Sequence, residues 1–235
     1  MIAGAIFDAD GTLLDSMPIW DNAAALYLEG LGYVPEPGLG RILYPMSMAE
    51  GADYLIARYG LSQSREEIVC GVSAAIEDFY FHRAQPKAGL EAFLRQLQER
   101  GIPMAVATSS DRRLVEAALK RLGLLSRFKG IFTCAQAGAG KSRPDVYHLA
   151  NRSLGGPKPQ SVWVFEDAFF AASTAGRAGY RVAVVRDPSA DGDREKLIGP
   201  LWSVRKREVL NEIDKELARR DSWQGKKYRE EEHGL

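Results

Sequence analysis

The chain has 235 residues, and its 31 Lys and Arg side chains balance its 31 Asp and Glu side chains, so the formal net charge is zero. This balance argues against a dedicated nucleic-acid-binding protein, which needs an excess of basic residues to displace counterions from phosphates. The content of 46% hydrophobic and 26% charged residues is that of an ordinary globular protein and excludes disordered and collagen-like chains.

The first residues and the cysteines indicate where the protein works. Residues 1–7 are apolar but end at Asp8, which makes them too short for the hydrophobic region of a secretory signal. No stretch approaches the roughly 20 apolar residues that a membrane span needs. Cys70 and Cys134 are too few for a disulfide framework and favour a reducing compartment. We therefore expect a cytoplasmic protein without a membrane partner, and we expect a monomer or a weak homodimer.

Five short segments are rich in β-branched or aromatic residues and are too continuously apolar for strands with one solvent-exposed face. Such segments are typical of the buried strands of a parallel sheet. They are Ile2–Phe7, Ile102–Thr108, Gly130–Cys134, Ser161–Glu166 and Arg181–Val185. Between them, helical spacing from Leu90 to Gly101 and from Asp111 to Gly123 ends each time at a glycine, a residue that commonly follows a helix. The alternation predicts an α/β fold with a Rossmann-like, doubly wound parallel sheet.

The alternation is interrupted once, between the first strand and the helix that begins near Ala88. Here helical spacing covers Trp20–Leu31, Met48–Tyr59 and Val69–Tyr80, and no segment is typical of a strand. Ligands of α/β sheets bind outside the carboxyl ends of the strands, so a helical insertion after the first strand would cover the site and exclude water. We predict that this insertion is a cap.

These patterns divide the chain into three parts. We predict a catalytic core of residues 1–15 and 86–202 and a helical cap of residues 16–85. The tail of residues 203–235 carries 17 charged residues among 33, with only a thin apolar stripe. We interpret it as a solvated helix that frays after Trp223, and we assign it no chemistry.

The segment FDADGTLLDS at residues 7–16 carries the densest chemical signal. Asp8 and Asp10 stand two residues apart where the first strand ends, so an extended backbone would point both carboxylates the same way, and Gly11 lets the chain turn. Two like charges this close are costly without a cation, and Mg²⁺ prefers oxygen ligands. A carboxylate can also attack phosphorus to give an acyl phosphate. Two aspartates with this spacing also occur in helix caps and turns. The position of this pair at a strand end is what favours a catalytic or metal-binding role.

Three further groups follow later strands. Thr108 and Ser109 close the second strand, where a hydroxyl and free backbone N–H groups ahead of a helix can hold a phosphate oxygen. Lys141 follows a glycine pair after the third strand and can neutralise a transferring phosphoryl group. Glu166 and Asp167 close the fourth strand, where buried acidic residues are costly unless they serve a metal or a hydrogen-bond network.

With these four motifs in this order, the chain resembles the haloacid dehalogenase superfamily, in its helical-cap (subfamily I) branch of phosphatases and β-phosphoglucomutase-like proteins. The matching motifs are DADGT at residues 8–12, the apolar strand that ends in Thr108, Lys141 in GKSRPD, and the pair Glu166–Asp167. The resemblance covers about residues 1–190 and leaves the tail outside.

The resemblance implies a Mg²⁺-dependent phosphomonoester hydrolase that acts on a small phosphorylated metabolite, such as a sugar or nucleoside phosphate. It implies that Asp8 is the nucleophile that becomes an aspartyl-phosphate and that Asp10 is the general acid and base. Thr108 and Lys141 would complete the catalytic set and hold phosphate oxygens, with Ser109 beside them. The implied metal ligands are Asp8, Asp10 through its main-chain carbonyl, Asp167 and the nearby Glu166.

The cap is expected to select the substrate. Related mutases place a histidine and an arginine in neighbourhoods that here contain Trp20 and Met48, so we expect these two residues to line the substrate pocket. An apolar cap core explains them equally well. Two alternatives stay open: a β-phosphoglucomutase-like phosphosugar mutase, and a catalytically silent binding protein on the same fold.

Overall fold

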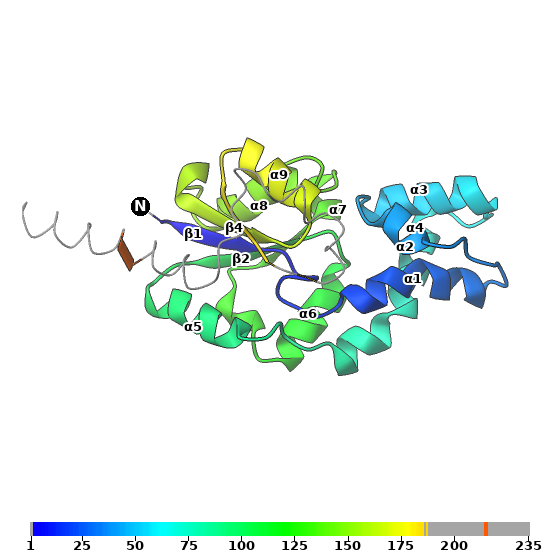
Figure 1. The fold of residues 1–235 in the computed structure, drawn as a ribbon, viewed down its shortest axis with the longest axis horizontal. Helices are drawn as coiled ribbons and strands as arrows, with labels where there is room; N and C mark the ends of the chain where they lie inside the picture. The colour runs from blue at the N-terminus through cyan, green and yellow to red at the C-terminus, as the bar shows by residue number, and fades with distance from the viewer. Residues whose placement is uncertain (1, 186, 188–213, 216–235) are drawn as a thin grey trace, which may run out of the picture.

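The computed structural model describes residues 2–185, 187 and 214–215 (Figure 1). Within these residues lies a five-stranded sheet in the order β3-β2-β1-β4-β5, and every neighbouring pair of strands is parallel. The strands are β1 (Gly4–Phe7), β2 (Met104–Thr108), β3 (Ile131–Thr133), β4 (Val162–Glu166) and β5 (Arg181–Val184). All five predicted strands are confirmed, each shorter by one or two residues than the apolar segment that predicted it.

Helices cover both faces of this sheet (Figure 1). One face carries α5 (Leu90–Glu99) and α6 (Arg112–Arg121), and the other carries α8 (Asp145–Ser153) and α9 (Phe169–Arg177). Because side chains alternate along a strand, Phe7 stacks on Phe165 at the α5 face, with ring centroids 4.4 Å apart, while Ile6 packs with Val146 of α8 on the other face. Burial on both faces explains why the strands are apolar except at their ends, where Thr108, Thr133, Glu166 and Arg181 lie, and the doubly wound sheet is confirmed.

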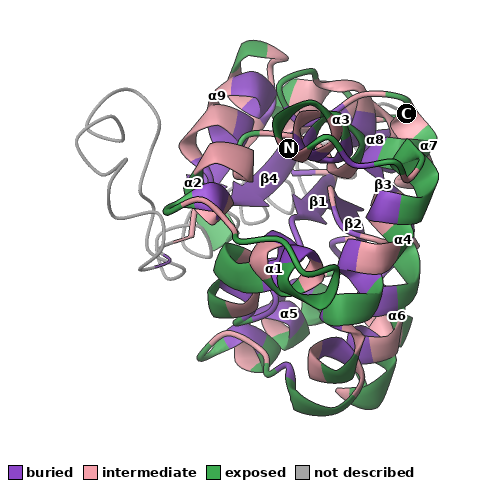
Figure 2. Cartoon of the chain, turned by 90° about the vertical axis from the view of Figure 1, so that its right-hand side faces the viewer, coloured by how far each residue is buried: buried purple, intermediate pink, exposed green. Residues whose placement is uncertain are grey.

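The inserted segment forms helices at one end of the sheet, the end at which β1 and β2 finish (Figure 1, Figure 2). The helices are α1 (Met17–Gly30), α2 (Leu39–Leu43), α3 (Met48–Tyr59) and α4 (Arg65–Ala75). Ser47 and Ser64 begin α3 and α4, and each exchanges hydrogen bonds with a glutamate three residues later, the arrangement called a capping box. The cap is therefore helical, as predicted.

The last part of the cap differs from the prediction of one helix over Val69–Tyr80. The helix α4 ends at Ala75, and a π-helical turn, η1, covers Phe79–Arg83. The wider turn is closed by the N–H of Ala84, which donates to the carbonyl of Phe79 at 2.7 Å. It buries Tyr80 completely and directs that side chain toward the end of β1.

Short elements connect the layers: α7 (Cys134–Ala137) and the 3₁₀ turns η2 (Leu125–Arg127) and η3 (Pro159–Ser161). The predicted charged tail of residues 203–235 lies outside the described residues except for 214–215, where Asp214 forms an ion pair with Arg100 of the loop after α5. No helix among the described residues has both the length and the apolar character to cross a membrane.

Candidate active site

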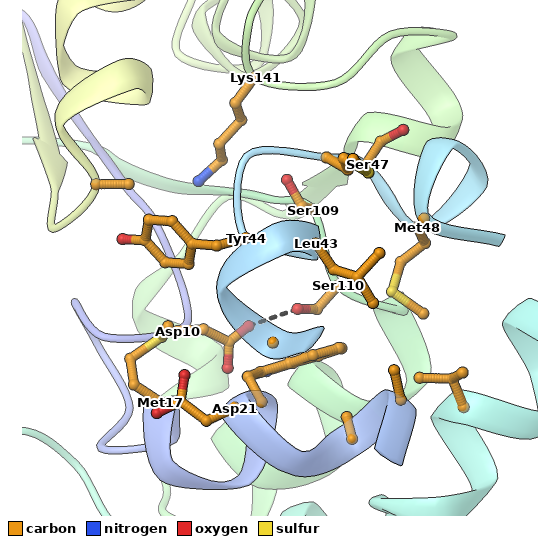
Figure 3. Close-up of a pocket in the computed structure, with 18 of the residues that line it drawn as sticks. Asp10, Met17, Asp21, Leu43, Tyr44, Ser47, Met48, Ser109, Ser110 and Lys141 are labelled. Carbon is orange, nitrogen blue, oxygen red and sulfur yellow. Dashed lines mark hydrogen bonds between the residues drawn. The ribbon is translucent and has the colours of Figure 1, made fainter. Parts of the chain in front are cut away.

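The carboxyl ends of β2, β1 and β4 are neighbours in the sheet, so the residues that follow these strands meet at one edge. Asp8 and Asp10 follow β1, Ser109 follows β2, and Asp167 follows β4. Lys141 reaches the same place from the loop between α7 and α8, and Figure 3 shows its side chain pointing into the site. The sheet topology thus brings together residues as far apart in the chain as Asp8 and Asp167.

Lys141 forms two buried ion pairs at the centre of the site. Its Nζ lies 2.5 Å from Oδ1 of Asp8 and 2.8 Å from Oε1 of Glu166, and all three side chains are almost completely buried. Burial by itself lowers the pKa of Lys141, but the two carboxylates outweigh it and raise that pKa above its usual value. Burial raises the pKa of Asp8, and the ammonium group opposes this effect. Lys141 is therefore a permanent cation beside Asp8.

Glu166 and Asp167 carry oxygen atoms that no hydrogen bond satisfies. Glu166 Oε1 accepts from the Tyr147 hydroxyl at 2.7 Å as well as from Lys141, but Glu166 Oε2 and Asp167 Oδ2 are buried without a partner among the described residues. Burial, and then the charge of Glu166, raise the pKa of Asp167 to about 7. Burying a carboxylate oxygen without a partner costs free energy, and a bound cation would offset this cost.

The same two residues form a candidate metal site with Asp8. One ligand atom from each of Asp8, Glu166 and Asp167 lies within 4.8 Å of the others, and all three side chains are buried. Oxygen-only ligands suit Mg²⁺. Gly11 makes room for this cluster, because its φ is +72° and a Cβ there would overlap Asp167 Oδ2. The residues present therefore fit the predicted metal.

Asp10 is held by three hydroxyl groups from three parts of the chain. Its Oδ1 accepts from Ser16 at 2.5 Å and from Tyr80 of η1. Its Oδ2 accepts from Ser110 at 2.5 Å, the bond drawn as a dashed line in Figure 3. The indole N–H of Trp20 donates in turn to the Tyr80 hydroxyl. The carboxylate of Asp10 is thus fixed in orientation by the core and by the cap at once.

Most of the predicted site residues line one cavity between the core and the cap, with a volume of about 150 Å³. They are Asp8, Asp10, Trp20, Met48, Ser109, Lys141, Glu166 and Asp167. Thr108 does not line this cavity: it is completely buried, and its hydroxyl accepts from the Ser110 N–H at 3.0 Å, which shapes the turn after β2. Thr108 is therefore placed to support Ser109 and Ser110, which do line the cavity.

Sequence reasoning assigned no role to the three residues that hold Asp10, nor to Tyr147. Ser16 is the last residue of the FDADGTLLDS segment, and Ser110 follows Thr108 and Ser109. Their positions next to these motifs could have indicated a role in the site. Tyr80 and Tyr147 stand at apolar positions of helical patterns and look like core residues. Only the assembled fold shows that their hydroxyls reach Asp10 and Glu166.

Comparisons with known proteins agree with this geometry. The family model of haloacid dehalogenase-like hydrolases matches residues 2–179. The chain is 30% identical to a validoxylamine A 7'-phosphate phosphatase of Streptomyces hygroscopicus subsp. limoneus over 86% of this chain and 95% of the relative. It is 28% identical to a phosphorylated carbohydrates phosphatase of Thermotoga maritima over 88% of this chain and 95% of the relative.

Solved structures share the fold at lower identity. CbbY from Rhodobacter sphaeroides, solved in complex with phosphate, superposes with a TM-score of 0.72 at 22% identity, over 80% of this chain and 87% of that one. A β-phosphoglucomutase from Clostridium difficile superposes with a TM-score of 0.71 at 17% identity, over 93% of this chain and 100% of that one. At these identities the likeness concerns the fold: a parallel sheet with a helical cap.

Proposed function

This chain belongs to the haloacid dehalogenase-like hydrolases and is a phosphatase, and we propose that it hydrolyses a small phosphorylated metabolite with Mg²⁺ and an aspartyl-phosphate intermediate on Asp8. The observation that carries this proposal is the buried cluster around Lys141, which contacts Asp8 and Glu166 while Asp167 lies beside them. Phosphoryl transfer through a covalent intermediate requires a nucleophile and positive charge at the phosphate oxygens. The cluster offers a carboxylate as the nucleophile, a lysine as a fixed cation, and unpaired carboxylate oxygens that can bind a metal ion.

In the first half-reaction, a carboxylate oxygen of Asp8 attacks phosphorus, and the bond between phosphorus and the ester oxygen breaks. Asp10 gives its proton to the leaving alkoxide, so the alcohol departs neutral. In the second, Asp10 takes a proton from water, and the water oxygen attacks the aspartyl-phosphate. Inorganic phosphate leaves, and Asp8 is again a carboxylate.

The remaining residues of the site stabilise the negative charge of the phosphate and hold Asp10 in position. Lys141 contacts phosphate oxygens as the negative charge spreads over them, and Ser109 adds a donor from the turn that Thr108 supports. Asp8, Asp167 and the Asp10 carbonyl, with Glu166 beside them, would hold Mg²⁺, which would supply the remaining positive charge. Ser16, Tyr80 and Ser110 hold Asp10 in one orientation for both proton transfers.

The mutase alternative is supported by the shared fold alone, and the lack of positive charge in the cap lining disfavours it. A phosphosugar mutase has to hold a doubly phosphorylated intermediate from both ends, so its cap needs positive charge. Lys141 of the core is the only Lys or Arg among the cavity-lining residues, all of which are described, and Trp20 and Met48 offer no charge. The silent-binder alternative is not favoured, because Asp8, Asp10, Lys141 and Asp167 are all present.

The test is hydrolysis of an aryl phosphate by the purified protein with Mg²⁺, beside Asp8→Asn and a matched control, Asp15→Asn. Asp15 lies in the same segment, but its side chain is 59% exposed, forms an ion pair with Lys87 at 3.2 Å and is not among the residues that line the cavity. We expect Asp8→Asn to lose activity by several orders of magnitude, as is usual when a covalent nucleophile is removed, and Asp15→Asn to stay near wild type. Equal rates for Asp8→Asn and the unmodified protein would overturn the assignment of the nucleophile.

A further inference from the structure

The part of the cavity that the cap contributes is mainly apolar. It continues directly from the Asp8 and Lys141 site and is walled by side chains from α2, α3 and α4, among them Leu43, Met48, Ala52, Leu55, Val69 and Val72. In Figure 3, Lys141 and Asp10 lie toward one side of the close-up and Met48 toward the other. A phosphate held at Lys141 therefore directs the rest of its ester toward an apolar wall.

Few polar atoms in this wall are available to a substrate. Within the cap, which is described throughout, four cavity-lining residues carry a side-chain nitrogen or oxygen: Trp20, Asp21, Tyr44 and Ser47. The Trp20 N–H already donates to Tyr80, and the Ser47 hydroxyl already accepts from the first turn of α3. A polyol that entered here would lose water from several hydroxyl groups and find few partners, and each unpaired hydroxyl weakens binding by about tenfold.

The charges of the wall also restrict the substrate. Asp21 is the single charged residue that the cap contributes to the cavity, and it is negative. Among the described residues that line the cap side of the cavity, a carboxylate or a second phosphate at the far end of the substrate would meet this negative charge and no Lys or Arg. The cation of the site, Lys141, is already paired with Asp8 and Glu166.

We infer that the preferred substrate is a monophosphate ester whose alcohol part is uncharged and predominantly apolar, rather than a polyol phosphate or a bisphosphate. This inference rests on the proposed function and names its substrate class. The apolar body packs against Leu55, Val69 and Val72 while the phosphate stays at Asp8 and Lys141. This substrate class differs from the carbohydrate phosphates for which several relatives of the chain are named.

The experiment compares three primary alkyl phosphates of equal carbon number: hexyl phosphate, hexitol 6-phosphate and hexane-1,6-diol bisphosphate. We expect kcat/KM for hexyl phosphate to exceed that for the hexitol phosphate by at least about tenfold and that for the bisphosphate by about a hundredfold. The hydroxyl groups make the hexitol the better leaving group, so leaving-group chemistry cannot produce this order. A higher kcat/KM for the hexitol phosphate or the bisphosphate would overturn the inference.

A binding measurement makes the result independent of turnover. Calorimetry of hexylphosphonate, which cannot be hydrolysed, should show binding with a negative heat-capacity change, the sign of buried apolar surface. The hexitol phosphonate should bind at least about tenfold more weakly. Equal affinities would overturn the inference even if the protein hydrolysed none of the three esters.

Paired variants locate the preference in the cap. Val69→Thr keeps the side-chain shape and adds a hydroxyl to the cavity wall, so it should lower the ratio of kcat/KM for hexyl over hexitol phosphate about threefold. Val34→Thr makes the same change at a side chain that is 87% exposed and outside the cavity, and it should leave the ratio unchanged. If both variants gave the same ratio, the apolar wall would not be the source of selectivity. Loss of all hydrolysis in the wild type, or full activity in Asp8→Asn, would instead contradict the proposed function.

Discussion

Replacing Lys141 by methionine tests whether the cluster of carboxylates depends on its buried cation. The ammonium lies 2.5 Å from Asp8 and 2.8 Å from Glu166. At an effective dielectric constant of about 20, these two attractions amount to roughly 6 to 7 kcal/mol each before the cost of removing the charges from water. Breaking a buried ion pair by deleting one partner usually costs about 3–5 kcal/mol, because the other charge stays behind.

We expect Lys141→Met to lower the free energy of unfolding by about 3–5 kcal/mol in urea titrations at pH 8 with EDTA. Lys120→Met is the matched control, because Lys120 is exposed on α6, and it should change the value by less than about 0.5 kcal/mol. Excess Mg²⁺ should restore part of the loss in Lys141→Met, because the same carboxylates are the proposed ligands. A loss below about 1 kcal/mol in EDTA would refute the reasoning, since the carboxylates would then tolerate one another without the lysine.

The remaining predictions concern the general acid, the metal cluster and its protons. Tyr80→Phe removes a hydroxyl that orients the proposed general acid, so kcat should fall about tenfold with little change in KM. The control Tyr33→Phe, on the cap surface, should change neither constant. A rise in KM alone for Tyr80→Phe would contradict a positioning role. Gly11→Ala should destabilise the protein in thermal unfolding far more than Gly123→Ala. Both glycines have positive φ, but only at Gly11 does a Cβ meet a carboxylate, and equal melting temperatures would refute the close approach. Because burial raises the pKa of Asp167 to about 7, the folded, metal-free protein holds a proton there that the unfolded chain releases near pH 4. The stability of the metal-free protein should therefore fall as the pH rises from about 4 to about 7. The increase in melting temperature caused by Mg²⁺ should be larger at pH 8 than at pH 5. A Mg²⁺-induced increase that is the same at both pH values, or larger at pH 5, would contradict this.

The sheet could be predicted from the sequence because its physical signal is local. A strand buried on both faces is expected to be apolar along its length; β1 satisfies this from end to end, and β4 does so up to its last residue, Glu166. The positions of Asp8, Lys141 and Asp167 then follow from topology, because loops after neighbouring parallel strands share one edge. The helical cap was also visible, since its apolar residues keep helical spacing.

The network around Asp10 could not be predicted, because its signal is not local. Tyr80 lies 70 residues from Asp10 and occupies a position that an apolar helix face would also fill. The π-helical turn that aims its hydroxyl depends on tertiary contacts, whereas spacing alone predicted a continuous helix. Trp20 lines the cavity, and its N–H donates to the Tyr80 hydroxyl, a contact between residues 60 positions apart that has no local signal in the sequence.

The apolar character of the cap cavity was likewise hidden. Met48 was equally consistent with a cap core and with a pocket wall, because both environments select the same residue types. The structure shows that it lines the cavity above the carboxylates. The sequence motifs predict the carboxylates and the lysine of the site, whereas the lining of the cavity on the cap side depends on the assembled fold.

Trapping the phosphoenzyme tests the central claim most directly. The protein is mixed with Mg²⁺ and a ³²P-labelled phosphomonoester, quenched in acid within one turnover, and digested. We predict acid-stable, base-labile label on the peptide that contains Asp8, its disappearance in a chase with unlabelled substrate, and no label in Asp8→Asn. Turnover without label on that peptide, or label on another residue, would contradict the account.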